Sequence, residues 1–207
     1  MNVLCLSPHT DDAEISAGGT ISRMVREGHD ICVMVFSPCI ASIPAGWRGS
    51  STREECRAAM RTLGIGRVDV LDYAVRHFPS HRQSILEDMI KMRQDFRPNM
   101  VLMPSVSDVH QDHRVIAEEG IRAFKTCGTV LSWESVKNMS PSMQGSCYMQ
   151  ISDEDLSQKT CACECYRSQC ARNPSTDILK ALAMVRGRQA GVDYAEMFEV
   201  VRWTMRT

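Results

Sequence analysis

A repeated alternation of apolar runs and amphipathic stretches constrains the fold of this 207-residue chain more than any other feature. Continuous apolar runs are typical of strands covered on both faces, and apolar residues at helical spacing predict the helices that cover them. Strands are expected near residues 2–6, 31–36, 68–71, 99–103, 130–133 and 194–203, and helices near residues 12–27, 52–63, 85–96, 115–124, 153–171 and 175–188. This order requires right-handed crossovers, so we predict a Rossmann-like three-layer α/β fold with a mostly parallel sheet and strand order 3-2-1-4-5.

Length and charge limit the number of domains and the class of partner. A chain of 207 residues with 43% apolar content buries one sizeable core, so residues 1–207 are predicted to form a single domain. The net charge of −1 is spread along the chain, which predicts a small-molecule partner and no nucleic acid. The first strand begins near Asn2, and no apolar run approaches the ~18–20 residues of a membrane span. We therefore expect a cytoplasmic protein without a transmembrane segment.

The ten cysteines are interpreted as reduced residues of a cytosolic protein. Several lie in predicted strands or helices, among them Cys5, Cys32 and Cys56, where a small apolar side chain fits. The denser cluster from Cys161 to Cys170 lies in a predicted helix, in which residues two apart point to different faces. It also lacks paired CxxC motifs and partner histidines, so we do not expect it to bind a metal.

Two polar segments each follow an apolar run and open a predicted helix. The first spans residues 7–14 and reads Ser-Pro-His-Thr-Asp-Asp-Ala-Glu, and the second spans residues 108–113 and reads Asp-Val-His-Gln-Asp-His. In strand order 3-2-1-4-5 the first and fourth strands are neighbours at the switch point, so their C-terminal ends meet in one crevice. We therefore expect the two segments to build one site.

Two imidazoles and one carboxylate suit a cation such as Zn²⁺ and leave coordination positions open for water and substrate. We predict one zinc ion per chain with His9, Asp12 and His113 as ligands, since His9 and Asp12 are close enough to converge across a strand-to-helix turn. Asp11 is left free beside the bound water and would accept its proton. His110 would face the substrate, where in its protonated form it would stabilise an oxyanion or protonate the leaving nitrogen.

Helix capping is a simpler interpretation of the first segment. Asp11 followed three residues later by Glu14 fits a capping box, which would account for both acids. Capping leaves His9 without a role, and it does not account for a second histidine segment at another strand end. We therefore favour the metal site.

Both segments resemble the two signature motifs of the LmbE-like, or PIG-L, family of zinc-dependent N-deacetylases. The first motif comprises Pro8 to Glu14 with Gly18, Gly19 and Thr20, and the second is residues 108–113. Thr10 departs from the family pattern, which usually has proline there, but this change removes no ligand. The likeness covers nearly the whole chain, because it continues through residues 53–55, 166–169, 186–187 and 194–199.

The resemblance implies a zinc-dependent hydrolase that removes an N-acetyl or other N-acyl group from an amino sugar or its conjugate. Acetate and a free amine would be released by attack of a zinc-bound water that Asp11 activates, with His9, Asp12 and His113 as ligands and His110 as the oxyanion stabiliser or acid. The partner would be a small N-acetylated sugar or glycoconjugate. The resemblance and a Met-rich, apolar C-terminal half also predict a homo-oligomer.

Other residues carry weaker signals. Asp108 and Asp112 are predicted to support the ligands without binding the metal. Specificity is expected in the loops at 37–51, 72–82 and 134–150, where the sequence identifies no sugar. Surface charges are more often solvated than functional, but four residues near the predicted crevice are candidates for substrate contacts: Arg53, Asp72, Arg76 and His77.

Two other functions fit parts of the pattern. Two histidines and a carboxylate also form the facial triad of non-haem iron oxygenases, although a free acid beside the ligands does not suit that chemistry. A catalytically inactive sugar-binding module of the same fold would keep the pocket without turnover. The five polar residues of the predicted centre favour an active hydrolase over both.

Overall fold

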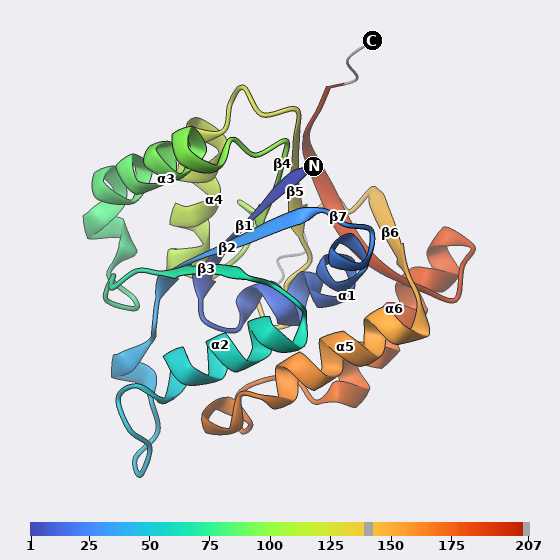
Figure 1. The fold of residues 1–207 in the computed structure, drawn as a ribbon, viewed down its shortest axis with the longest axis horizontal. Coiled ribbons are helices and arrows are strands. Elements are labelled where there is room, and N and C mark those ends of the chain that lie inside the picture. The colour runs from blue at the N-terminus through green and yellow to red at the C-terminus, as the bar shows by residue number, and fades with distance from the viewer. Residues whose placement is uncertain (139–142, 205–207) are drawn as a thin grey trace.

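A mixed sheet of seven strands forms the middle layer of the computed structural model, which describes residues 1–138 and 143–204 (Figure 1). The strand order is β3-β2-β1-β4-β5-β7-β6, with the first five strands parallel and β7 antiparallel to both β5 and β6. The predicted Rossmann-like fold and the order 3-2-1-4-5 are confirmed. The strands are β1 (Asn2–His9), β2 (Asp30–Ser37), β3 (Arg67–Val70), β4 (Met100–Pro104), β5 (Thr129–Trp133), β6 (Cys147–Ile151) and β7 (Tyr194–Trp203).

Helices cover both faces of this sheet, α3 and α4 on one face and α1, α2 and α5 on the other, while α6 packs beside β7 (Figure 1). In the described part of the chain, none of the helices combines the length and hydropathy needed to cross a bilayer. The helices are α1 (Asp12–Arg26), α2 (Ser51–Thr62), α3 (Arg82–Phe96), α4 (Gln111–Ala123), α5 (Asp153–Glu164) and α6 (Thr176–Ala190), with 3-10 turns η1 (Ile40–Ser42), η2 (Phe78–His81) and η3 (Arg167–Gln169).

The central strand β1 shows why its sequence is a continuous apolar run. Val3 and Cys5 pack into the cluster under α1 and α2, and Leu4 and Leu6 pack into the cluster under α3 and α4. All four side chains are fully buried. A strand with helices on both faces has no solvated side, so its sequence cannot alternate with polar residues.

Strand β6 is not among the predicted strands, because its first four residues lie in the expected loop at 134–150. Its residues Cys147, Tyr148 and Met149 are half-buried and Gln150 is exposed, as expected for an edge strand with a weak apolar pattern. The strand exists through antiparallel pairing with β7, in which Ile151 lies opposite Tyr194. Residues 139–142 of the expected loop lie outside the described residues.

The helix expected at 153–171 is shorter than predicted. Helix α5 ends at Glu164, and the chain continues into η3. Tyr166 interrupts the helix with φ −86° and ψ 64°, and its side chain is buried with only 1% exposure. A tertiary contact of Tyr166, described below, thus overrides the local helical tendency.

The sheet opens at the C-terminal ends of β1 and β4. The two strands pair only over Val3 to Cys5, whereas β1 continues beside β2 as far as His9 opposite Ser37. Helix α1 then leaves β1 towards one face of the sheet and α4 leaves β4 towards the other. This is the switch point of a doubly wound sheet, where such folds place their ligands.

Gly187 of α6 lies close to the backbone of the turn before β7, and we predict that Gly187→Ala lowers the free energy of unfolding by about 1–3 kcal/mol through overpacking. A β-carbon at Gly187 would lie 2.3 Å from the carbonyl oxygen of Asp193, which directly precedes β7. Gly66→Ala is the control, since nothing lies within 4 Å of its β-carbon position. Urea unfolding of both variants tests this. Equal urea midpoints for the two variants would show that the turn before β7 shifts to accommodate the added methyl group without loss of stability.

Candidate active site

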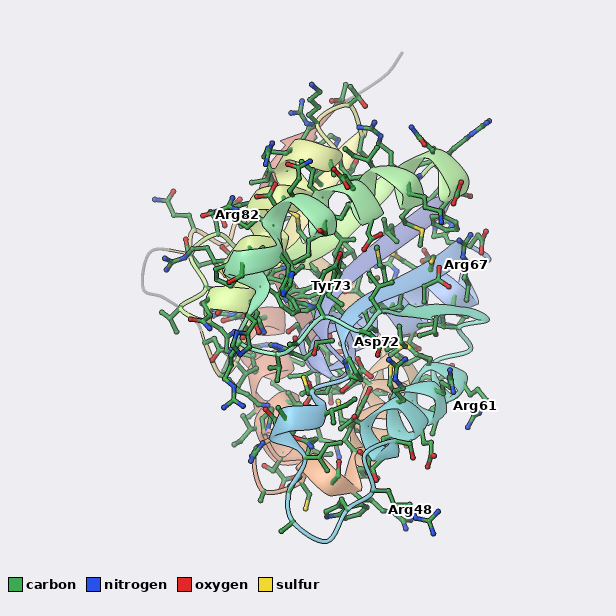
Figure 2. The ribbon with its side chains drawn as sticks, turned by 90° about the vertical axis from the view of Figure 1, so that its left-hand side faces the viewer. Arg48, Arg61, Arg67, Asp72, Tyr73 and Arg82 are labelled. Carbon is green, nitrogen blue, oxygen red and sulfur yellow. The ribbon has the colours of Figure 1, made fainter. Side chains whose placement is uncertain are left out.

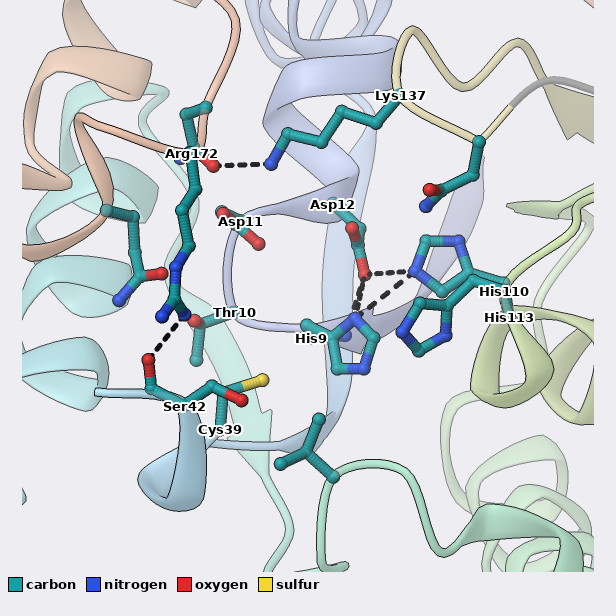
Figure 3. Close-up of a pocket in the computed structure, with 14 residues that line it drawn as sticks. His9, Thr10, Asp11, Asp12, Cys39, Ser42, His110, His113, Lys137 and Arg172 are labelled. Carbon is teal, nitrogen blue, oxygen red and sulfur yellow. Dashed lines mark hydrogen bonds and ion pairs between the residues drawn. The ribbon is translucent and has the colours of Figure 1, made fainter. Parts of the chain in front are cut away.

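The two histidine segments meet at the switch point, where three donor atoms form a tight triangle (Figure 3). Asp12 Oδ2 lies 3.0 Å from His9 Nδ1 and 3.1 Å from His113 Nε2, and these two nitrogens are 3.2 Å apart. His9 is 8% exposed and His113 is 2% exposed. Tetrahedral Zn²⁺ with bonds of about 2.0–2.1 Å has its ligand atoms roughly 3.3 Å apart. The donor types and their spacing therefore fit a metal ion.

Two buried carboxylates hold the imidazoles from behind. His9 Nε2 lies 3.2 Å from Asp112 Oδ2, and His113 Nδ1 lies 2.8 Å from Asp108 Oδ2. Each ring therefore uses one nitrogen for a carboxylate and directs the other nitrogen to the centre of the triangle. Such partners fix the tautomer and orientation of metal-binding histidines.

The turn after β3 supports Asp112 through its main chain. The amide of Arg76 donates to Asp112 Oδ2 at 2.6 Å, and the amide of Phe78 donates to Asp112 Oδ1 at 3.3 Å. Arg76 adopts a left-handed conformation with φ 72°, which is uncommon outside glycine and is maintained here by these contacts. Arg76 thus reaches the site through its backbone, and its side chain does not line the cavity.

The electrostatics of the triangle favour a cation. Burial lowers the pKa of both histidines, but Asp12 and the supporting carboxylates outweigh it and raise the pKa to about 10 for His9 and about 9 for His113. Burial raises the pKa of Asp12, yet His113 and His9 hold it well below its usual range. Positive charge, as protons or as a metal ion, therefore binds strongly between these groups.

His110 lies beside the triangle and lines the cavity. Its ring centroid is 4.9 Å from that of His9 and 4.8 Å from that of His113, and nitrogens of all three rings lie within 4.8 Å of one another. His110 Nδ1 accepts a hydrogen bond from the amide of Asp112 at 3.2 Å, so in the neutral ring Nε2 carries the proton. Burial and the neighbouring histidines lower the pKa of His110, which keeps it a neutral donor.

The structure rules out the capping-box interpretation of Asp11 and Glu14. Asp11 occupies the N-cap position of α1 without a side-chain hydrogen bond to the helix. It lines the cavity, and within the described residues its carboxylate makes no hydrogen bond. Glu14 is fully buried and faces Tyr166 instead. Asp11 is thus a carboxylate next to the triangle that has no hydrogen-bond partner among the described residues.

The hydrogen bonds of Tyr166 indicate whether the Glu14 side chain is protonated. The single hydroxyl of Tyr166 contacts both the carbonyl oxygen of Thr10 and Glu14 Oε1. A carbonyl only accepts, so the tyrosine donates to Thr10 and the second bond needs a proton on Glu14. Burial raises the pKa of Glu14 to about 8, and within the described residues its other oxygen has no hydrogen-bond partner, as expected of a neutral acid. This chain of bonds fixes the main chain just before Asp11.

A cavity of about 260 Å³ opens in front of the triangle. Beyond the predicted residues its wall contains side chains that sequence reasoning missed. Thr10 belongs to the first signature motif and Gln169 to a segment that shares the family likeness, whereas the others lie outside any recognisable motif. These additional lining residues are Thr10, Cys39, Ser42, Val75, Lys137, Asn138, Gln169, Arg172 and Asn173.

Three of the weaker candidates lie away from this cavity. Arg53 pairs with Asp72 and also donates to the carbonyl oxygen of Val70 at 3.2 Å. Asp72 is on the surface after β3, with its side chain 80% exposed (Figure 2). His77 is exposed before η2. The geometry therefore adds no support for substrate contacts by these residues.

The cysteine-rich segment contributes nothing to the triangle. The ten cysteines, all of them among the described residues, form no disulfide with one another, and Cys161 is exposed whereas Cys163 is buried. The side chains of Cys161 and Cys163 lie on different faces of the helix, as expected for residues two apart. Within the described residues, the histidine cluster is the group whose spacing suits a metal ion.

The fold and the site define an α/β protein with a histidine and carboxylate centre at the switch point of its sheet. Residues 4–124 match the family model of GlcNAc-PI de-N-acetylase, PIG-L. The chain belongs to this family.

Individual relatives resemble the chain over different lengths. It is 29% identical over 134 residues to diacetylchitobiose deacetylase from Thermococcus kodakarensis, a match that covers 61% of this chain and 50% of the relative. The chain therefore spans about half the length of that enzyme.

Solved structures share the fold at low identity. N,N'-diacetylchitobiose deacetylase from Pyrococcus horikoshii has a TM-score of 0.81 at 21% identity, covering 97% of this chain and 83% of that one. GalB, the 4-carboxy-2-hydroxymuconate hydratase from Pseudomonas putida KT2440, has a TM-score of 0.83 at 19% identity, covering 100% and 98%. The same fold thus carries a deacetylase and a hydratase, so function must be inferred from the site.

The proton assignment at Glu14 generates a stability prediction. Tyr166→Phe should lower the free energy of unfolding by about 1–3 kcal/mol, because it leaves the Thr10 carbonyl and the Glu14 carboxyl buried without a partner. Glu14→Gln should change it by much less, since an amide N–H can donate to the tyrosine as the neutral acid does. Urea unfolding at pH 6 compares the two. If Glu14→Gln lowers the free energy of unfolding as much as Tyr166→Phe does, Glu14 is ionised in the native protein.

Proposed function

We propose that the protein is a zinc-dependent N-deacetylase that hydrolyses the N-acetyl amide of an amino sugar or its conjugate, releasing acetate and a free amine. The observation that carries this proposal is the triangle of His9, Asp12 and His113 with an unengaged Asp11 beside it. Membership of the PIG-L family supports the reaction class.

His9, Asp12 and His113 would hold the zinc, with Asp108 and Asp112 fixing the two imidazoles. When bound in such a site, zinc polarises an acyl carbonyl and lowers the pKa of water to about 7. Three protein ligands would leave coordination positions open for the acyl carbonyl oxygen and for the water molecule. A centre with three protein ligands supports a catalytic role, because a purely structural zinc site is closed by four protein ligands.

The remaining polar residues supply proton transfer and charge stabilisation. Asp11 accepts a proton from the attacking water, which adds to the amide carbonyl carbon. His110 donates its Nε2 proton in a hydrogen bond to the oxyanion that develops on the carbonyl oxygen. As the C–N bond breaks, Asp11 returns this proton to the departing amine nitrogen, so that acetate and a neutral amine are released. His110 therefore acts as a neutral donor, consistent with the bond between its Nδ1 and the amide of Asp112.

Three further properties belong to this proposal. The chain is one catalytic domain, it works in the cytoplasm on a small N-acetylated sugar or glycoconjugate, and it assembles as a homo-oligomer. Light scattering at working concentration tests the assembly, for which a monomer would be the contrary result. Cell fractionation tests the location.

Acetate release from zinc-loaded protein is the direct test of the reaction. Methyl N-acetylglucosaminide, N-acetylated nucleotide sugars and glycolipid head groups form a suitable panel, with the metal-stripped protein as the control. Turnover without oxygen consumption excludes the oxygenase alternative. Tight sugar binding with no acetate from any member of the panel would instead identify an inactive binding module.

Asp11 and Asp12 are chemically alike and differ only in where the turn directs them. Asp11→Asn should retain zinc and lower kcat by about 10²- to 10⁴-fold, since it removes the base. Asp12→Asn should instead lower zinc content, because it removes a ligand. Metal analysis and kcat of the two variants, measured side by side, test the assignment. A fully active Asp11→Asn enzyme would contradict the mechanism.

The supporting carboxylates generate a separate prediction about metal affinity. Asp108 accepts from the amide of His110 with one oxygen and from His113 Nδ1 with the other, both at 2.8 Å, whereas asparagine has only one accepting oxygen. If that oxygen stays on the amide of His110, the NH2 group faces His113 Nδ1 and favours the tautomer protonated on Nε2, which has no lone pair for the metal. Zinc affinity should fall about 10- to 100-fold in Asp108→Asn and Asp112→Asn, measured by competition with a chelator. Asp95→Asn is the matched control, because Asp95 is exposed on α3. Unchanged affinity in both variants would leave these two acids without the proposed role.

A further inference from the structure

Helix α6 has apolar residues on the face that it turns away from the protein, as well as on the face that it packs. The packed face contains Leu179, Ala183 and Gly187, which are buried at helical spacing. This face contacts β7, β6 and α5, and Figure 1 shows α6 at the outside of the molecule beside these elements. The solvent side of a surface helix normally carries polar residues, so an apolar solvent side is suited to contact another molecule.

The outer face of α6 is formed by Ile178, Ala181, Met184 and Val185. Ile178, Met184 and Val185 are 51%, 53% and 52% exposed, and Ala181 is exposed between them. In the described part of the chain, none of the other α-helices exposes a large apolar side chain to this extent. Single exposed apolar residues are common on protein surfaces, but a contiguous group of them marks an interaction surface.

Two opposite charges lie at the two ends of this outer face. Asp177 is in the first turn of α6 and Arg188 is in the last turn. Both are exposed, and neither side chain forms an ion pair or a hydrogen bond with another described residue. Asp177, Ala181, Met184 and Arg188 are spaced by four, three and four residues, which is the spacing of a helix face that meets a second helix.

We propose that the outer face of α6 pairs with the same face of a second copy of this chain, with the two helices antiparallel about a two-fold axis. In this arrangement Asp177 of each copy lies opposite Arg188 of the other, and the small Ala181 lies opposite the larger Met184. A parallel pair would instead bring like charges together at both ends, which is unfavourable. The distribution of charge therefore identifies both the partner and its direction.

This inference rests on the homo-oligomer proposed above and gives it a contact surface, but it does not depend on the deacetylase reaction. A single pair of helix faces is smaller than a standard interface of about 1,600 Å². The contact by itself should therefore form a dimer that dissociates on dilution.

Val185→Glu tests the apolar part of the contact. It places a carboxylate in the middle of the paired faces, so the dissociation constant should rise about 10- to 100-fold. Sedimentation velocity over a dilution series measures this as a shift towards smaller species. Arg61→Glu is the control, because Arg61 is exposed on α2, and it should leave the assembly unchanged. Thermal unfolding of each variant checks that the fold is retained.

Two charge reversals test the antiparallel direction. Asp177→Lys and Arg188→Glu should each weaken self-association, because each puts like charges opposite one another at both ends of the pair. An equimolar mixture of the two variants should associate again, since every contact between them joins opposite charges. In a parallel pair neither reversal would weaken association, because the wild-type protein would already oppose like charges.

The contrary results separate this interface from the wider proposals. A wild-type protein that stays monomeric throughout the dilution series would overturn both the interface and the homo-oligomer. An oligomer that Val185→Glu and both charge reversals leave unchanged would overturn the interface and leave the homo-oligomer standing. Charge variants that dissociate alone and also fail to associate when mixed would contradict the antiparallel pairing. Acetate release from the same preparations reports on the deacetylase reaction independently.

Discussion

The buried carboxylate of Asp112 is the interaction on which the site depends. It accepts from His9 at the end of β1 and from the main-chain amides of Arg76 and Phe78 after β3. Segments far apart in the sequence are thereby tied to the start of α4, where β1 and β4 separate. A buried carboxylate must find donors, because an unpaired charge away from water is very costly. That requirement fixes the position of the histidine triangle.

The C-terminal half, beyond residue 124, holds the first helix of the site in place. Helix α1 is kinked at Ala17, and Glu196 of β7 accepts from the freed amides of Gly19 at 3.0 Å and Thr20 at 2.7 Å. Lys159 of α5 pairs with the same buried carboxylate. The turn that carries His9, Asp11 and Asp12 is thus supported from strand β7 and helix α5, which explains how remote elements contribute to a site built from two short segments.

Prediction from sequence succeeded where the signal is local. The apolar runs of β1, β2 and β4 mark strands covered on both faces, and the polar segments that follow β1 and β4 mark the ends where these strands meet. The half-exposed strand β6 was missed because its pattern is weak and it exists only by pairing with β7. Lys137 and Arg172 were missed because nothing in the sequence distinguishes them from the other lysines and arginines of the chain.

The sequence by itself determined the strand order of the parallel half, the family likeness and the residues that meet at the switch point, because period and spacing are properties of neighbouring residues. Only the tertiary structure decided what each acid does. Within the described residues the Asp11 carboxylate makes no hydrogen bond, whereas Glu14 is hydrogen-bonded to Tyr166, which follows the distant helix α5. It also decided that two loop cations face one cavity. Burial and partners set the charge and direction of a side chain, and these arise only when distant segments pack together.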